Sequence, residues 1–186
     1  MESNYSEQIK KVSTINGAYI GCMWLASFVC MANTVSSPIL SLLGLGIGIG
    51  SLFAIVIMAY QFYWKICNGA LQFTRSWLLV LLIILYASIL MAFGVYIYMQ
   101  FFDNGNFGLY YDQMLKEPTT KAMMDQIFAE SGLTSEDFVA QITSLSPIRL
   151  ALNILESNLF LGFLISLPLT LLSRIKLRSS TNKVNQ

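Results

Sequence analysis

Four long apolar segments constrain the fold of this chain more than any other feature. Each is as long as the roughly 20 residues that an α-helix needs, at about 1.5 Å rise per residue, to cross a bilayer core of roughly 30 Å. Charged residues make up 11% of the chain, whereas an ordinary soluble domain has about 25%. We therefore predict an all-α polytopic membrane protein that forms one domain over residues 1–186. The predicted spans are residues 15–35, 39–63, 77–102 and 148–172.

Charged residues between the predicted spans are sorted by sign. The loop at residues 103–147 has seven acidic residues and two lysines, whereas the loop at 64–76 and the tail after 172 carry only basic charges. Because cytoplasmic loops collect lysine and arginine, we predict that both termini are cytoplasmic and that the loop 103–147 is extracytoplasmic. The spans then pair as two antiparallel hairpins. A basic rim that would favour anionic lipid headgroups consists of Lys65, Arg75, Arg174, Lys176 and Arg178.

The second span contains a glycine at every second position of one stretch. Within an apolar segment of this length a lone strand would leave its backbone unpaired in lipid, so we interpret the stretch as helix. Helical spacing then gives two interleaved GxxxG pairs, Gly44 with Gly48 and Gly46 with Gly50. Such pairs let a second helix approach closely. Packing inside the bundle is the commoner use of this pattern, and self-association or a partner helix is the alternative.

The acidic loop shows two helical patterns. Residues 119–131 place apolar side chains on one side and precede Gly132, a typical residue just after a helix end. Thr134 and Asp137 resemble a capping box that leads into a helix at residues 138–145. We expect two short amphipathic helices that lie on the outer membrane interface or cap the bundle. Their acidic character offers an alternative role as a docking surface for a basic partner.

Glu156 is the sharpest local clue to a function within the spans. A carboxylate in the middle of a span costs about 2.5–3.5 kcal/mol, so we expect Glu156 to face the bundle interior or a water-filled cavity. Asn153 and Arg149 precede it at spacings that place all three near one helix face, and Asn33 is a possible hydrogen-bond partner. Two interpretations stay open. The group binds a proton, a cation or a polar headgroup, or it is a buried polar group that sets helix register.

Several function classes are disfavoured by the composition. A net charge of +1 gives no broad basic face for nucleic acid. The chain has no histidine, the commonest metal ligand and proton shuttle. No phosphate-binding loop is recognisable, and no nucleophile lies beside a plausible base. The acids of the loop are not grouped like metal ligands. We therefore expect no enzyme activity, no metal, no cofactor and no nucleic-acid partner.

Four short sequences carry a resemblance to a known family. Tyr63-Trp-Lys-Ile-Cys-Asn-Gly-Ala-Leu-Gln-Phe follows the second span, and Tyr96-Ile-Tyr lies in the third. Met123-Met-Asp-Gln-Ile lies in the acidic loop, and Leu161-Gly-Phe-Leu-Ile-Ser166 in the fourth span. In this order they resemble the domain-of-unknown-function 4199 family, an uncharacterised bacterial family of Bacteroidota. The resemblance implies a four-helix domain of the inner (cytoplasmic) membrane with no assigned activity. It also implies that the protein is encoded beside glycosyltransferases that act on polyprenyl phosphates.

These observations favour a non-catalytic accessory or scaffold subunit of a membrane complex. The expected partners are membrane lipids together with another membrane protein or a second copy of the chain. The alternative is a small transporter or a polyprenyl-linked-sugar flippase that uses the carboxylate of Glu156. A polar cavity around Glu156 would favour transport. A dry, glycine-packed bundle with an exposed apolar groove would favour a subunit.

Overall fold

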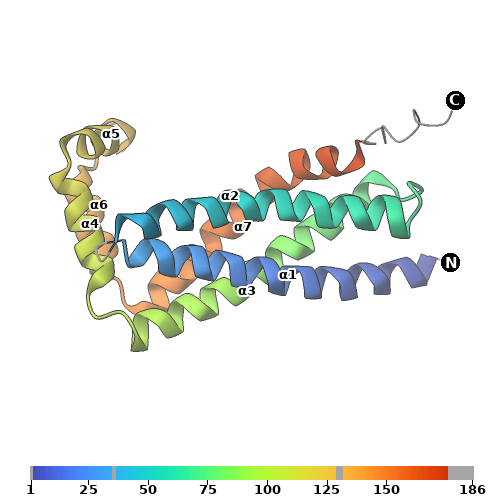
Figure 1. The fold of residues 1–186 in the computed structure, drawn as a ribbon, viewed down its shortest axis with the longest axis horizontal. Helices are drawn as coiled ribbons and strands as arrows, with labels where there is room; N and C mark the ends of the chain where they lie inside the picture. Colours follow the sequence, from blue (N-terminus) through green and yellow to red (C-terminus); the bar gives the residue numbers. More distant parts are fainter. Residues whose placement is uncertain (1, 35–36, 129–131, 176–186) are drawn as a thin grey trace, which may run out of the picture.

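Four long helices lie side by side in the computed structural model, which describes residues 2–34, 37–128 and 132–175. Every regular element within these residues is a helix. All four long helices are long and apolar enough to cross a membrane, which confirms the prediction of an all-helical chain with four candidate spans. The start of the first and the end of the last lie at one end of the bundle (Figure 1). The long helices are α1 (Glu2–Ala32), α2 (Pro38–Gln61), α3 (Phe73–Phe101) and α7 (Pro147–Arg174).

The helix α3 is the centre of the bundle. In its most apolar stretch 44% of the residues are buried, against 22% in each of the other three long helices. The helix α1 packs most extensively against α3, and α7 packs on α3 as well. A Cβ atom added at Gly17 of α1 would lie 2.6 Å from Tyr86 Cβ, and one added at Gly162 of α7 would lie 2.4 Å from Ile84 Cγ2. Glycine therefore lets both helices approach α3 closely.

The bounds of the long helices differ from the predicted spans in instructive ways. The helix α1 begins at Glu2, so it includes several polar turns before the apolar segment that was predicted to start at residue 15. The helix α2 passes into a single π-helical turn, η1 (Phe62–Ile66), which buries Phe62 and Tyr63. The helix α7 continues through Pro168 to Arg174. A proline inside an apolar helix is tolerated where neighbouring helices and side chains satisfy the freed backbone group.

Three short helices cover the opposite end of the bundle, which we call the loop end (Figure 1). The predicted helix at 119–131 is α5 up to Phe128, and residues 129–131 lie outside the described residues. Gly132 has the left-handed φ of +71° expected beyond a helix end. The helix predicted at 138–145 begins earlier, at Ser135. The three helices are α4 (Asn106–Lys116), α5 (Pro118–Phe128) and α6 (Ser135–Thr143).

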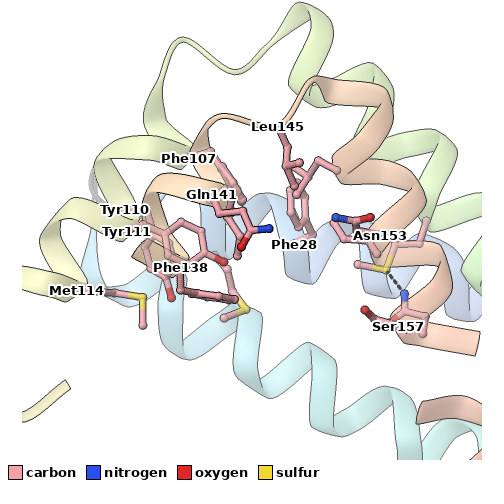
Figure 2. A pocket seen from close by; sticks show the side chains of 17 residues that line it. Phe28, Phe107, Tyr110, Tyr111, Met114, Phe138, Gln141, Leu145, Asn153 and Ser157 are labelled. Atoms are coloured by element: carbon pink, nitrogen blue, oxygen red, sulfur yellow. Dashed lines mark hydrogen bonds between the residues drawn. The ribbon is translucent and has the colours of Figure 1, made fainter. Parts of the chain in front are cut away.

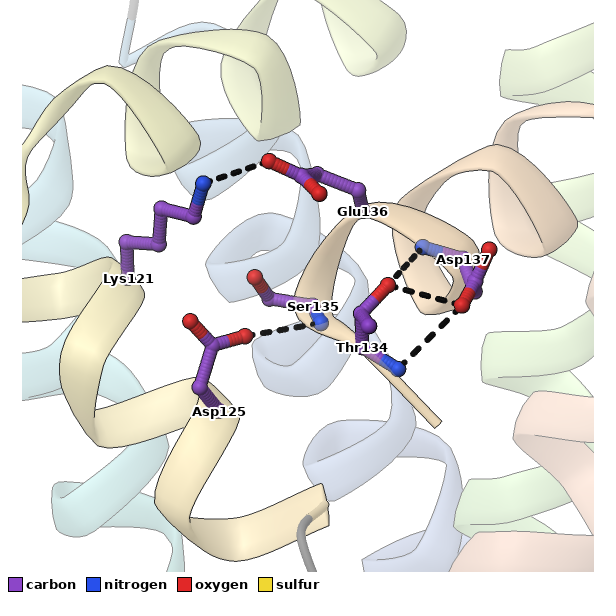
Figure 3. A network of polar contacts seen from close by, with 6 residues as sticks. All are labelled: Lys121, Asp125, Thr134, Ser135, Glu136 and Asp137. Atoms are coloured by element: carbon purple, nitrogen blue, oxygen red, sulfur yellow. Dashed lines mark hydrogen bonds and ion pairs between the residues drawn. The ribbon is translucent and has the colours of Figure 1, made fainter. Parts of the chain in front are cut away.

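The start of α6 confirms the predicted capping box. The Asp137 backbone N–H donates to Thr134 Oγ1 at 3.1 Å, and the Thr134 N–H donates to Asp137 Oδ2 at 3.3 Å (Figure 3). Next to this box, the Ser135 N–H donates to Asp125 Oδ1 of α5 at 3.0 Å. Hydrogen bonding by Ser135 holds the pKa of Asp125 below its usual range. Lys121 also pairs with Glu136 across the same two helices. These contacts join α5 to α6.

The helix α4 was missed by the sequence analysis. Its first turn is held by Asp103, whose Oδ1 accepts a hydrogen bond from the Phe107 N–H at 3.0 Å. The Phe107 side chain is buried and lies 6.1 Å from the ring of Phe28 in α1. Packing of this aromatic residue, rather than a clear local pattern, places α4 against the end of the bundle.

Candidate functional site

The four glycines of α2 do not form one packing face. A Cβ added at Gly44 would lie 2.7 Å from Met31 Cγ and 3.0 Å from the Ser27 carbonyl oxygen of α1. One added at Gly48 would meet the Ser27 hydroxyl at 3.4 Å. At Gly46 and Gly50 it would meet no atom of the described residues within 4 Å. The first pair therefore packs inside the bundle, and the second pair opens onto the outer surface of α2.

Large apolar side chains flank the open glycine pair. Those of Leu42, Leu45, Ile49 and Phe53 are all exposed to surroundings outside the protein. With Gly46 and Gly50 they form a surface that we call the open glycine face. Exposed apolar side chains are expected on any helix that lies in lipid. The two glycines distinguish this surface, because small residues let another helix approach closely.

The predicted polar site around Glu156 is not assembled. Glu156 is exposed on α7, so of its two expected surroundings, the bundle interior and a water-filled cavity, the first is not observed. Among the described residues no hydrogen bond or ion pair reaches its carboxylate. Arg149 is also exposed. The face of α7 that turns to α3 is occupied instead by small residues such as Gly162 and Ser166, which allow close packing and leave no room for a long charged side chain.

Asn33 lies in a separate polar contact at the loop end. Its Nδ2 donates to the Tyr98 hydroxyl of α3 at 2.7 Å, and its Oδ1 accepts from Asn106 Nδ2 of α4 at 3.2 Å. Asn33 therefore links α1, α3 and α4, which is a structural role. Neither Glu156 nor Asn153 takes part in this contact.

The predicted basic rim is described only in part. Lys65 is exposed, as a headgroup-binding residue should be, whereas Lys176 and Arg178 lie outside the described residues. Arg174 is half-buried: its guanidinium carbon lies 4.6 Å from the centre of the Tyr63 ring, and its Nη2 donates to the Tyr63 hydroxyl at 3.2 Å. Arg174 thus ties the end of α7 to η1. Arg75 is half-buried on α3.

A cavity of about 640 Å³ lies at the loop end of the bundle. Residues of α1, α3, α4, α6 and α7 surround it, and Figure 2 shows Tyr110, Tyr111 and Met114 of α4 across the cavity from Asn153 and Ser157 of α7. A volume of this size is typical of small-molecule sites, which span about 300–1,000 Å³. Among the described residues of the predicted polar site, Asn153 is the one that lines this cavity.

The lining of this cavity is apolar with a few neutral polar groups. The apolar part includes Phe28, Phe138 and Ile154, and the polar part includes Gln141 and Asn158. Asn158 is itself engaged, since its Nδ2 lies 3.1 Å from Met91 Sδ. Burial raises the pKa of both Tyr110 and Tyr111, so their hydroxyls stay neutral at physiological pH. No charged side chain lies among the described residues that line the cavity.

Two features of the site escaped the sequence analysis. Gly17 and Gly21 are spaced as a GxxxG pair, and both pack against α3, where a Cβ at Gly21 would lie 2.9 Å from the Ala87 carbonyl oxygen. The same spacing rule that was applied to α2 would have found this pair. The cavity carried no such signal, because its lining residues come from separate segments of the chain.

Comparison with known proteins identifies one relationship. A family model described as "Protein of unknown function (DUF4199)" matches residues 15–174. No curated protein and no solved structure matches the chain.

Proposed function

The chain belongs to the DUF4199 family of proteins of unknown function, and from that premise we propose that it is a non-catalytic subunit of a membrane-protein complex. Four long apolar helices suggest a multi-pass membrane protein. In this complex, α2 binds a transmembrane helix of a different protein through its open glycine face. The observation that carries the proposal is the empty space beside Gly46 and Gly50.

Glycine in the middle of a helix lowers the stability of that helix, so its presence at a position calls for a compensating contact. A glycine destabilises a helix interior by about 0.5–1 kcal/mol relative to alanine. At Gly44 the close contact with Met31 and Ser27 provides that reason. At Gly46 and Gly50 no described residue of the chain explains the glycine, because an alanine there would contact none of them within 4 Å. A partner helix that approaches closely at these positions supplies the missing reason, since association in lipid depends on such close packing.

The transporter alternative has less support from the geometry. A transporter or polyprenyl-linked-sugar flippase that uses Glu156 needs this carboxylate in a polar cavity. The side chain of Glu156 is instead exposed on α7, and the cavity at the loop end is lined mainly by apolar side chains. A bundle packed on small residues, with an open glycine face on its surface, is the arrangement expected of a subunit.

The charge distribution supports an orientation for this subunit. The described acidic residues of the 103–147 segment lie at the loop end, and Lys65 and Arg75 lie toward the other end (Figure 1). Under the positive-inside rule the loop end is extracytoplasmic and both termini are cytoplasmic. The proposed location is the inner membrane of a bacterium, with the four spans arranged as two antiparallel hairpins.

The test is co-purification from native membranes at the endogenous level of expression. The double variant Gly46→Leu/Gly50→Leu places two bulky side chains on the open glycine face, and Ala26→Leu adds the same kind of bulk to an exposed position of α1. We expect a stoichiometric membrane partner with the wild-type chain and with Ala26→Leu, and its loss with the double variant.

Two outcomes would contradict the proposal. The first is a partner that is retained by the double variant as well as by Ala26→Leu, since the open glycine face would then not be the contact. The second is recovery of the wild-type chain alone or as a homo-oligomer. Unfolding of each purified variant in detergent serves as the control for folding.

A further inference from the structure

The cavity at the loop end is separate from the open glycine face, and Glu156 is not among its described lining residues, although the neighbouring Asn153 and Ser157 are. It is closed on one side by α1, α3 and α7, which are apolar helices of membrane-spanning length, and on the other side by α4 and α6. It therefore lies where the hydrocarbon core of a bilayer would give way to the interface. We propose that this cavity binds one acyl chain of a phospholipid from the membrane leaflet at the loop end.

The lining has the chemistry that a hydrocarbon chain requires. Aromatic rings and aliphatic side chains form most of it, and no charged side chain is present among the described lining residues. Three methionines contribute, and methionine adapts its shape to irregular apolar ligands because it is unbranched and flexible. They are Met31, Met91 and Met114.

Water and vacuum are both poor occupants of such a space. A buried water needs two to four hydrogen-bond partners, and the polar groups of this lining are few among its apolar side chains. An empty apolar cavity loses the dispersion contacts that its lining atoms would make with an occupant. A cavity of about 640 Å³ that is mainly apolar therefore favours an apolar ligand over either alternative.

The mouth of the cavity opens toward the surface that lipid would cover. Asn153 and Ser157 line the cavity, and both are also exposed on α7. On the same helix Leu152 and Phe160 are exposed apolar side chains. An acyl chain can therefore enter sideways from the bilayer, between α7 and the short helices, without passing through water.

The charge beside this mouth fits a phosphate group. Arg149 lies in the first turn of α7, one helical turn before Asn153, and its side chain is exposed. Residues four apart share a helix face, so Arg149 lies on the side of α7 where the cavity opens. Glu156 lies about one turn further along that side, deeper in the apolar part of α7. The phosphate of a phospholipid would thus pair with Arg149 near the end of the span, while its chain enters the cavity.

Photolabelling of the purified full chain tests the proposal directly. The chain is reconstituted into phosphatidylethanolamine vesicles that contain phosphatidylglycerol with a diazirine at the end of one acyl chain. After illumination, labelled peptides are identified by mass spectrometry. We expect labels on Met114 and Phe138, which lie in helices beyond the spans. Ile127 of α5 is strongly exposed but does not line the cavity, so it should remain unlabelled. Equal labelling of Ile127 and the cavity residues would overturn the proposal.

A cavity-filling variant provides the second measurement. Ser157→Phe places a ring in the mouth, and Leu152→Phe adds bulk to an exposed position of α7 that does not line the cavity. Relative to labelling of Phe53 on α2, we expect Ser157→Phe to reduce labelling of Met114 about tenfold, which is the discrimination that one misfitting group gives in a hydrophobic pocket. Leu152→Phe should leave the ratio unchanged. An unchanged ratio in both variants would contradict the proposal.

The headgroup part of the proposal has its own test. Arg149→Gln should reduce labelling of Met114 by the phosphatidylglycerol probe and leave labelling by a diacylglycerol with the same diazirine unchanged. If both probes lose labelling equally, Arg149 does not contact the phosphate. If the diacylglycerol labels wild-type protein as strongly as phosphatidylglycerol does, the cavity selects the chain alone and the assignment to a phospholipid is wrong.

Discussion

The close packing of α1 on α3 gives the sharpest prediction about stability. In the variant Gly17→Ala/Gly21→Ala, each new methyl group meets atoms that cannot rotate away: Tyr86 Cβ at 2.6 Å and the Ala87 carbonyl oxygen at 2.9 Å. Overpacking of this kind costs about 1–3 kcal/mol per site. Alanine returns about 0.5–1 kcal/mol per site through its higher helix propensity. We expect the pair to lose about 2 kcal/mol of unfolding free energy, which lowers the folded-to-unfolded ratio about 30-fold.

The matched control is Gly46→Ala/Gly50→Ala. It makes the same chemical change at the same spacing, but its methyl groups meet nothing within 4 Å. Only the propensity gain remains, so this variant should be as stable as the wild-type chain or more stable by about 1–2 kcal/mol.

Equilibrium unfolding of the purified chains measures both variants. Unfolding is driven by sodium dodecyl sulfate in dodecylmaltoside micelles and followed by far-ultraviolet circular dichroism and by tryptophan fluorescence. Trp24 and Trp77 are suitable reporters, because each indole N–H donates across helices, to Ser51 and Ser166 respectively, at 2.7 Å. If the Gly17/Gly21 variant is no less stable than the Gly46/Gly50 variant, the assignment of the first pair to the bundle interior and the second to its surface is refuted.

Three further predictions concern single contacts. Arg174→Met should lower the free energy of unfolding by about 2 kcal/mol, because it removes the cation–π contact and the hydrogen bond to Tyr63. Equilibrium unfolding in detergent measures this loss. Thr134→Ala should destabilise α6 by about 1 kcal/mol and speed amide hydrogen exchange in its first turn, whereas unchanged exchange would argue against the capping box. The hydrogen bond from Ser135 to Asp125 should stabilise the loop at pH values above the usual Asp pKa of 3.8 and be lost as the pH falls through the lower pKa that Asp125 has in the folded chain. Amide hydrogen exchange in α6 should therefore rise only in strongly acidic solution. A rise already near pH 6 would contradict the assignment of this contact.

Some features of the chain could be predicted from local sequence, whereas others depend on contacts between distant residues. The capping box at Thr134 and Asp137 was recognisable because it needs only two side chains three residues apart. The helix α4 was not, because its position depends on Phe107 packing against Phe28 of α1, far away in the sequence. The energetic cost of a carboxylate in lipid led to the prediction that Glu156 faces the interior or a water-filled cavity. In the structure, small residues of α7 occupy the face that meets α3.

The glycines of α2 show the same limit. Their spacing alone predicted two pairs that allow close helix approach, and both pairs looked equivalent. The position of α1 then made Gly44 a buried contact and left Gly46 and Gly50 open. No property of the α2 sequence distinguishes the two pairs, because a glycine acquires its role from the atoms that surround it.

The sequence by itself determined which segments become the four long helices. That choice depends on apolar length and on backbone hydrogen bonds within each segment, and both are local properties. Only the tertiary structure decided which face of each helix is buried, where Glu156 lies, and that five of the helices, α1, α3, α4, α6 and α7, enclose a cavity. These features depend on contacts between residues far apart in the chain, and such contacts exist only once the helices have packed.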